Sequence, residues 1–407
     1  MADASFQTGL RLLRQPDIGK LFVAYLISYT GTAMAPIAMA FGVLELTGST
    51  RDAAIVIAAP TLASIVVMLF GGVLADRTSR QYIIVIAETL AMVSQFAIAI
   101  LFLTDQATVL WLTLLMLVNG VAMALNAPAA TGLIIQLVDR EDLQAANALL
   151  GTARNGAVAG GAALGGILVA VFGAGVTLMI DAVSFGLSAL LVFMLNPMRQ
   201  VQPDKASMMQ DLQLGWREFT SHTWLWVIVL QFSLVVAAMQ SVFGLVGPAV
   251  TRDHMSGAVD WGFIAGSFGV GTLFGGLLAL KVSPRYPMRF ATCLVFLFTG
   301  VPLTLAFLLP VYVVAVAAFV EGVAGQLFAV IWYTTLQRQI PPDMLSRVSA
   351  YDHLGSIVLA PIGIVVAGVL FELLGFRTTL FIAALTVILP TMAVLTVRDV
   401  RMMTRLQ

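Results

Sequence analysis

Charged residues, cysteine and histidine are scarce in this chain of 407 residues. Lys, Arg, Asp and Glu make up 10% of it, whereas soluble domains carry about 25%. The chain cannot cover a water-facing surface, which excludes a soluble protein. The cations and the anions number 21 each, so no basic excess is available to bind nucleic acid. The single cysteine, Cys293, excludes both an intramolecular disulfide and a thiolate metal cluster.

Signals for metal or nucleotide chemistry are also missing. The three histidines, His222, His254 and His353, are scattered and do not have the spacing of a metal site. No loop of the form G-x-x-x-x-G-K-[ST], which would bind a nucleotide, occurs in the sequence. We therefore expect no metal, no cofactor, no ATP-driven pumping and no enzymatic activity.

Apolar residues make up 60% of the chain, and they fall into runs long enough to cross a bilayer, which takes roughly 20 residues. Only a helix satisfies its own backbone hydrogen bonds in such a run. We therefore predict an all-α membrane protein with twelve transmembrane helices. The predicted spans are 20–46, 54–75, 81–104, 108–136, 144–172, 175–195, 223–250, 260–280, 289–309, 311–336, 347–372 and 378–397.

The positive charges are distributed unevenly between the two sides of these spans. Of the 21 Lys and Arg residues, 17 fall on the side of the N-terminus, three fall on the opposite side, and Arg154 lies within a span. Because positive residues are retained in the cytoplasm, this bias predicts that both termini are cytoplasmic. Only an even number of spans allows that arrangement.

The two halves of the chain repeat at a shift of about 203 residues. Phe70–Arg77 aligns with Phe274–Lys281, and Val118–Ala122 aligns with Val320–Ala324. Two such bundles repeated in parallel are typical of carriers that work by alternating access. We predict two pseudo-symmetric six-helix bundles, 1–196 and 223–407, joined by a cytoplasmic loop, 197–222, in which residues 204–219 form either a short interfacial helix or a simple loop.

The segment from Gly72 to Arg80 resembles the loop signature G-x-x-x-D-R-x-G-R of the major facilitator superfamily, with Ser79 in place of the second glycine. The resemblance implies the fold of that superfamily and a conformational latch. In the latch, the Asp76 carboxylate faces the start of the eleventh span, and the arginines meet acids of the neighbouring loop. The latch residues are Gly72, Asp76, Arg77, Arg80, Glu141 and Asp142.

Three further segments, Leu137–Ala148, Ile180–Phe185 and Gln339–Val348, resemble bacterial exporters related to the enterobactin exporter and the macrolide efflux proteins. The resemblance implies proton-linked efflux of siderophores or drugs across the bacterial inner membrane. The antiporter motifs of that branch are altered here, since Met116 stands where an arginine is usual and Ala162 stands where a proline is usual.

Charged side chains inside the spans are functional candidates, because each costs about 2.5–3.5 kcal/mol to insert at the bilayer centre. Glu321, near the middle of the tenth span, ranks first for proton coupling, although it could instead serve helix packing. Arg154 either holds an anionic substrate or neutralises Asp181. The proton-coupling candidates are Glu321, Asp181, Glu88 and Asp352.

Polar side chains inside the spans are the candidates for binding the substrate. Glutamines in the seventh span either line a cavity or hold helices together as amide contacts. The substrate-binding candidates are Asn119, Arg154, Asn155, Gln231 and Gln240.

The resulting prediction is a secondary active transporter that exports small amphipathic molecules in exchange for protons. The alternative is an importer of a nutrient such as an organic acid or a sugar, but the sequence offers few intramembrane polar groups to bind one. The expected partners are a small-molecule substrate, protons and the lipid bilayer, and the chain is expected to be a monomer that does not bind nucleic acid.

Overall fold

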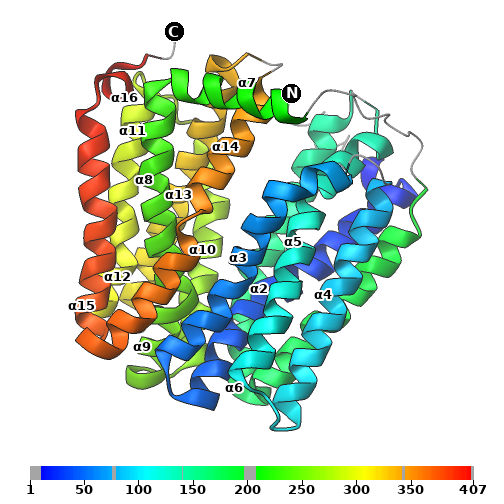
Figure 1. Ribbon diagram of the computed structural model, residues 1–407, viewed down its shortest axis with the longest axis vertical. Coiled ribbons are helices and arrows are strands. Elements are labelled where there is room, and N and C mark those ends of the chain that lie inside the picture. The colour runs from blue at the N-terminus through cyan, green and yellow to red at the C-terminus, as the bar shows by residue number, and fades with distance from the viewer. Residues whose placement is uncertain (1–10, 76–78, 140, 197–207, 342–343, 405–407) are drawn as a thin grey trace. The chain divides into compact units, whose positions relative to one another are not determined.

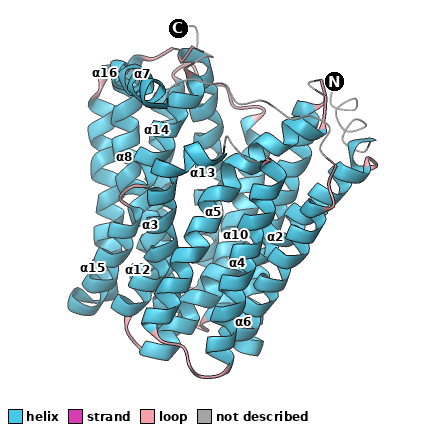
Figure 2. Ribbon diagram, turned by 45° about the vertical axis from the view of Figure 1, so that its right-hand side comes forward, coloured by secondary structure: helices cyan, strands magenta, loops and turns pink. Residues whose placement is uncertain are grey.

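The computed structural model describes residues 11–75, 79–139, 141–196, 208–341 and 344–404. All regular secondary structure in these residues is helical (Figure 2). By its internal contacts the chain divides into two units, which we call unit 1 (Met1–Leu46 and Ala59–Asp204) and unit 2 (Thr47–Ala58 and Lys205–Gln407). The boundaries expected from the sequence, 1–196 and 223–407, remain a prediction.

Unit 1 consists of long apolar helices, as the hydrophobic runs predict (Figure 1). The hydroxyl of Thr108 caps the helix that begins at Val109 by accepting a hydrogen bond from the Trp111 N–H at 3.4 Å. The helices are α2 (Pro16–Thr47), α3 (Thr50–Ala75), α4 (Arg80–Leu103), α5 (Val109–Leu137) and α6 (Leu143–Phe193), and the first turns of α3 belong to unit 2.

Unit 2 contains the remaining helices, several of which are short. Its elements are α7 (Met208–Ser221), α8 (Thr223–Ser241), the π-helical turn η1 (Val242–Val246), α9 (Gly247–His254), α10 (Ala258–Ala279), α11 (Pro287–Leu294), the 3-10 turn η2 (Val295–Thr299), α12 (Gly300–Ala306), α13 (Val311–Gln339), α14 (Leu345–Ile357), α15 (Ala360–Thr396) and α16 (Arg398–Met402).

Two of the longest helices reverse direction at a glycine. Gly173 in α6 has φ 79° and Gly375 in α15 has φ 78°, a backbone conformation that glycine adopts without steric cost. The two glycines are 202 residues apart, which is the shift of the internal repeat. In each turn a threonine hydroxyl, that of Thr177 or Thr379, donates to the glycine carbonyl.

These reversals account for the number of membrane passes. In the described part of the chain, ten helical stretches are long and apolar enough to cross a membrane. The stretches Ala145–Phe193 and Leu345–Thr396 have 49 and 52 residues, and a straight helix of that length would measure about 75 Å, against a hydrocarbon core of about 30 Å. Each of these two stretches therefore makes two passes. The total of twelve confirms the predicted fold class of two pseudo-symmetric six-helix bundles.

The repeat also preserves a close helix contact in each unit. A Cβ atom added at Gly120 would collide with the carbonyl oxygen of Pro60, and one added at Gly322 would collide with that of Phe268. Gly120 and Gly322 are again 202 residues apart. Glycine lets two backbones approach closely. Each contact therefore fixes the position of α5 or α13 along the helix that it touches.

Three predicted single spans of unit 2 are broken in the structure. The seventh span, 223–250, is interrupted by η1, and the ninth, 289–309, is interrupted by η2. The eleventh, 347–372, is interrupted at Val358 and Leu359, between α14 and α15. The predicted spans hold, since Thr223–His254, Pro287–Ala306 and Leu345–Thr396 each remain one helical stretch, but the type of helix changes or a turn intervenes inside them.

A proline follows each of these breaks. Proline lacks an N–H group, and its ring clashes with the carbonyl group four residues earlier, so the chain deforms there. Pro248 acts in this way on Gly244 in η1, Pro302 on Phe298 in η2, and Pro361 on Ile357 at the end of α14. Each of these residues lies four positions before its proline.

Residues 47–58 join unit 2 through contacts with α15. The Thr50 hydroxyl donates to the Gly368 carbonyl at 3.0 Å. The Glu372 carboxylate accepts from the Ser49 hydroxyl at 2.7 Å and from the Arg51 N–H at 3.0 Å. The start of α3 is therefore held by hydrogen bonds to a helix that lies more than 300 residues away in the sequence.

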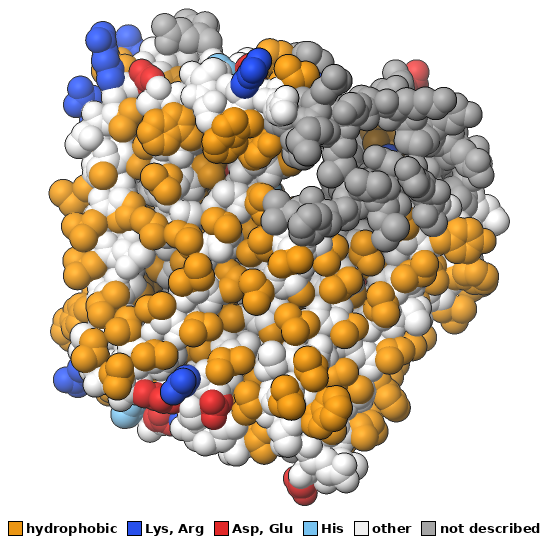
Figure 3. Space-filling model, viewed as in Figure 1, with side chains coloured by type: hydrophobic (Ala, Val, Ile, Leu, Met, Phe, Trp, Pro, Cys, Tyr) orange, Lys and Arg blue, Asp and Glu red, His pale blue; other side chains and the backbone are white. Residues whose placement is uncertain are grey.

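The connection between the bundles contains a helix. α7 lies across the ends of α8 and α14 (Figure 1), and the rings of its Trp216 and of Tyr351 in α14 are 5.4 Å apart. This favours the helical alternative over 208–219, the part of the segment 204–219 that the structure describes. On the face of unit 2 drawn in Figure 3, hydrophobic side chains cover the middle, and charged side chains gather at the two ends, as expected for helices that cross a bilayer.

Candidate functional site

Unit 2 contains a half-open cavity with a volume of about 560 Å³. Ligand pockets commonly have about 300–1,000 Å³, so the space suits a molecule of drug size. The breaks η1 and η2 and the end of α14 each contribute a lining residue, and α8, α10 and α13 complete the wall. Seven lining residues are aromatic, namely Phe232, Phe243, Phe268, Phe298, Phe328, Trp332 and Tyr333.

Three of these rings form a continuous stack. The Phe232 and Phe328 rings have centroids 4.2 Å apart and an interplanar angle of 28°. The Phe328 and Trp332 rings lie 6.1 Å apart at 17°. Stacked rings lose little entropy when a ligand binds, because each has few rotatable bonds, and they offer a large apolar surface.

Glu321 on α13 lines this cavity and is 2% exposed. The backbone N–H of Val301, in the first turn of α12, interacts with its carboxyl group. The Oε2 atom has no hydrogen-bond partner among the described residues. A buried oxygen without a partner is uncommon in folded proteins, so Glu321 has an open acceptor position for a proton or a ligand.

A second carboxyl group lines the same cavity. Asp352 on α14 is 7% exposed and accepts a hydrogen bond from the Trp332 Nε1–H at 3.0 Å. His353 and Gln240 are lining residues as well. The structure therefore brings together Glu321, Asp352 and Gln240, which were predicted from three separate spans.

Gln231 does not line the cavity. It is 2% exposed, and its Nε2 donates to the Thr391 hydroxyl of α15 at 2.8 Å. Of the two alternatives left open by the sequence, this geometry matches the amide contact between helices and not the contact with substrate.

Unit 1 contains a smaller and more polar cavity of about 190 Å³, between α2, α4, α5 and α6. Glu88 on α4 lies in its wall and is 6% exposed. Its carboxylate accepts from the Asn126 Nδ2–H at 2.9 Å and from the Ser28 hydroxyl at 3.2 Å. Asn119 lines the same space, and its Nδ2 has no partner within the described residues.

Asp181 is fully buried beside this cavity, and an amide holds it. Its Oδ2 accepts from the Gln95 Nε2–H at 2.6 Å, and its Oδ1 faces the Ser184 hydroxyl at 3.5 Å. The predicted ion pair with Arg154 is not found. Arg154 is exposed and interacts instead with the Tyr29 side chain.

Asn155 follows Arg154 on α6 and is half-buried, but it does not line the unit 1 cavity. Of the predicted substrate contacts, Asn119 lies in the cavity of unit 1 and Gln240 in that of unit 2. The cavity residues that sequence reasoning missed are the aromatic ones. The i, i+4 spacing of Phe328 and Trp332 was the available signal for them.

The latch predicted by the family signature is only partly described. Asp76, Arg77 and the surroundings of Gly72 lie outside the described residues. The Asp142 carboxylate accepts two bonds from the Arg11 Nη2, at 2.6 and 2.7 Å, and Glu141 is exposed.

Arg80 does not bond to Asp142 in the structure. Its guanidinium lies against Gly132 on α5, where a Cβ atom would collide with it. The adjacent Gln81 donates to the carbonyls of Val192, Phe193 and Leu195, which satisfies the end of α6. Sequence reasoning missed both Arg11 as the partner of Asp142 and Gln81 as a helix cap.

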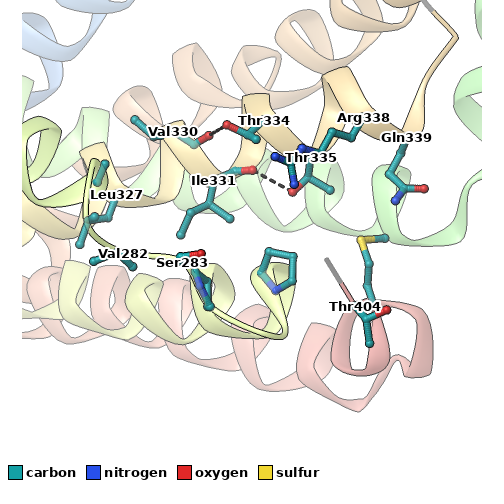
Figure 4. A pocket seen from close by; sticks show the side chains of 14 residues that line it. Val282, Ser283, Leu327, Val330, Ile331, Thr334, Thr335, Arg338, Gln339 and Thr404 are labelled. Carbon is teal, nitrogen blue, oxygen red and sulfur yellow. Dashed lines mark hydrogen bonds between the residues drawn. The ribbon is translucent and has the colours of Figure 1, made fainter. Parts of the chain in front are cut away.

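A further pocket of about 170 Å³ lies at one end of unit 2 (Figure 4). It is formed by the last turns of α13, the connection between α10 and α11, and Thr404. The Thr335 hydroxyl is bonded to the Ile331 carbonyl, and Arg338 is the charged side chain among the described lining residues (Figure 4). None of the predicted site residues lines this pocket.

Two curated proteins are similar to the chain over nearly its whole length. The "Multidrug efflux pump Tap" of Mycolicibacterium fortuitum is 25% identical over 389 residues, which cover 92% of this chain and 94% of that protein. The "Enterobactin exporter EntS" of Escherichia coli is 25% identical over 378 residues, covering 89% of each chain.

Solved structures share the fold. The nucleoside transporter NupG matches with a TM-score of 0.73 at 14% identity, covering 93% of this chain and 98% of that one. A bacterial homologue of the iron transporter ferroportin, in an inward-facing state, matches with a TM-score of 0.75 at 16% identity, covering 93% and 98%. The family model described as "Major Facilitator Superfamily" matches residues 21–351. Since that match covers most of the chain, this protein belongs to the Major Facilitator Superfamily.

Proposed function

We propose that this protein exports small amphipathic molecules by alternating access, in exchange for protons. Its family membership makes it a multi-pass membrane protein and a secondary transporter of a small-molecule substrate. The proposal adds the direction, the driving ion and the class of substrate. It also places the protein in a bacterial inner membrane with both termini in the cytoplasm, on the basis of the distribution of Lys and Arg.

The observation that carries the proposal is the aromatic cavity of unit 2. Its wall is made mostly of apolar and aromatic side chains, with a carboxyl group at Glu321 and another at Asp352. A sugar or an organic acid has several polar groups, each of which needs a hydrogen-bond partner when it is buried. An amphipathic molecule needs few such partners and gains from contact with the rings. The relatives Tap and EntS, named as a multidrug efflux pump and a siderophore exporter, support the same class.

Four buried carboxyl groups support coupling to protons. Glu321 and Asp352 lie in unit 2, and Glu88 and Asp181 lie in unit 1. No ion pair to any of the four is formed by the described residues. An ionised carboxylate is much more costly to bury than a neutral acid. Uptake of a proton when the group is enclosed, and its release when water enters, would link the conformational cycle to a proton gradient.

The test is transport by the purified full-length protein in liposomes. A pH gradient, acid inside, is imposed, and the panel contains a lipophilic cation, a macrolide, a siderophore, a sugar and an organic acid. We expect at least one amphipathic compound to accumulate, and a protonophore to abolish its accumulation. Accumulation of only the sugar or the organic acid, under the opposite gradient with acid outside, would support a proton-coupled importer instead. Accumulation that persists after the gradient collapses would contradict proton coupling.

A further inference from the structure

The ionisable side chains in the wall of the unit 2 cavity are mostly acidic. Glu321 and Asp352 contribute carboxyl groups, and the one basic side chain among the described lining residues is that of His353. Neither Lys nor Arg lines the cavity in the part of the chain that the structure describes. An anionic ligand would find no Lys or Arg there, and either acid, when ionised, would repel it from beside a largely apolar wall.

The open position on Glu321 points to a ligand that carries a donor or a positive charge. Its Oε2 is buried and has no partner among the described residues, while the same carboxyl group meets the Val301 N–H. A carboxylate only accepts hydrogen bonds. An ammonium or another cationic group at this oxygen would supply the missing partner, and a neutral or anionic acceptor would not.

The residues of α13 that line the cavity occur in a defined order. Glu321, Gly325, Phe328 and Trp332 follow one another at intervals of four, three and four residues, which places them on one face of the helix. Gly325 leaves space directly after the carboxyl group. At a rise of 1.5 Å per residue, Phe328 lies about 10 Å and Trp332 about 16 Å along the helix axis from Glu321.

We infer that this cavity selects amphipathic cations, with the charged group at Glu321, the apolar body over Gly325 and the far end against the rings of Phe328 and Trp332. The inference rests on the proposed function, because it takes this cavity as the place where the substrate binds. The rings add to the preference, since the face of an aromatic ring attracts cations and repels anions. The carboxyl group would therefore select the sign of the ligand's charge, and the stacked rings would select the size of the ligand.

Two probe ions of nearly the same size and shape test the sign of the charge. Tetraphenylphosphonium is a cation and tetraphenylborate is an anion, and both present four phenyl groups. Binding of each ion to the full-length protein in detergent is measured by equilibrium dialysis against protein-free micelles. We expect the phosphonium to bind at least about tenfold more tightly than the borate. Equal binding of the two ions, or tighter binding of the borate, would overturn the inference.

Variants then locate the effect. Glu321→Gln, which keeps the shape of the side chain, should weaken phosphonium binding by about tenfold and leave borate binding unchanged or stronger. Gly325→Leu should weaken the binding of both ions, because the new side chain fills the space over which the body lies. Glu45→Gln, at an exposed acid of α2 in unit 1, is the matched control and should change neither.

The outcomes separate this inference from the proposed function. Retained borate binding in Glu321→Gln shows that the variant is folded, so loss of phosphonium binding is then a loss of charge recognition. Charge-selective binding without gradient-driven transport would refute the proposed function and support the cation site. Gradient-driven transport of amphipathic compounds with no preference for the phosphonium would support the proposed function and refute the cation site.

Discussion

Replacement of Glu321 by Gln is the sharpest test of the coupling mechanism. The amide has the same shape as the acid and keeps an oxygen for the Val301 N–H, and its NH₂ group replaces the Oε2 that has no partner among the described residues. The helix contact at the adjacent Gly322 is not altered. The variant should therefore fold, and at this site it loses the negative charge that attracts a cation together with the ability to bind and release a proton.

The expected loss of substrate accumulation follows from this single site. One proton moving down a gradient of one pH unit supplies about 1.4 kcal/mol. If one monovalent cation is exchanged for each proton, the exchange is electroneutral, and accumulation reaches at most about tenfold per pH unit. In the Gln variant the gradient is no longer linked to the substrate through Glu321, so the ratio of inside to outside concentration should fall to about one.

The assay is accumulation of tetraphenylphosphonium in liposomes that contain the purified protein, with the pH inside one unit below that outside. The membrane potential is clamped with potassium and valinomycin, because the probe is itself charged. The matched control is Glu45→Gln, which should accumulate the probe as the unchanged protein does. Full accumulation by Glu321→Gln would refute the coupling role of this residue and direct attention to Glu88 and Asp181.

Three other predictions follow from particular contacts. Gly322→Ala should destabilise the protein by about 1–3 kcal/mol, because the new Cβ atom collides with the backbone of α10. Gly325→Ala is the control, since the Cβ atom there makes only ordinary contact. Thermal unfolding in detergent compares the two variants, and equal melting temperatures would contradict the close approach of the helices at Gly322. Arg11→Ala and Asp142→Ala should each cost less than about 1 kcal/mol, since the pair is partly exposed, and a double-mutant cycle that gives a larger coupling would contradict this. Phosphonium binding should weaken as the pH falls, by at most about tenfold per pH unit if one proton competes with the ion at Glu321. Glu321→Gln should reduce this pH dependence. An unchanged pH profile in the variant would argue against competition at this carboxyl group.

The fold was predictable because membrane helices leave strong marks in a sequence. Apolar length, the side preference of Lys and Arg, and the repeat all indicated twelve passes, and the structure confirms the fold class. The repeat was visible at Gly120 and Gly322, where the structure shows why glycine is required. The turns at Gly173 and Gly375 obey the same shift, although in a sequence a glycine at a turn looks like any other glycine.

The breaks in the helices could not be read from the prolines alone. Pro248 and Pro361 follow interruptions, whereas Pro36 and Pro128 lie inside unbroken helices. Neighbouring helices can satisfy the backbone groups that a proline leaves free, so the local sequence does not decide the outcome. The cavity depends on these breaks, since Phe243 of η1 is one of its lining residues.

The sequence indicated the buried acids correctly as polar residues inside helices, but it did not give their partners. The partner of Asp181 is Gln95, 86 residues earlier in the chain, and not Arg154. The partner of Asp142 is Arg11 and not Arg80. Such pairings depend on the rotation of each helix about its axis, and packing against neighbouring helices sets that rotation.

The central claim is that the substrate binds in the aromatic cavity of unit 2. The most direct measurement is photolabelling of the full-length protein with a benzophenone derivative of a triphenylphosphonium cation, followed by mass spectrometry of the labelled peptides. We expect the label on Val311–Gln339 (α13) and on Thr223–Ser241 (α8), with excess tetraphenylphosphonium suppressing it. Suppressible label confined to the helices around Glu88 in unit 1 would contradict the account.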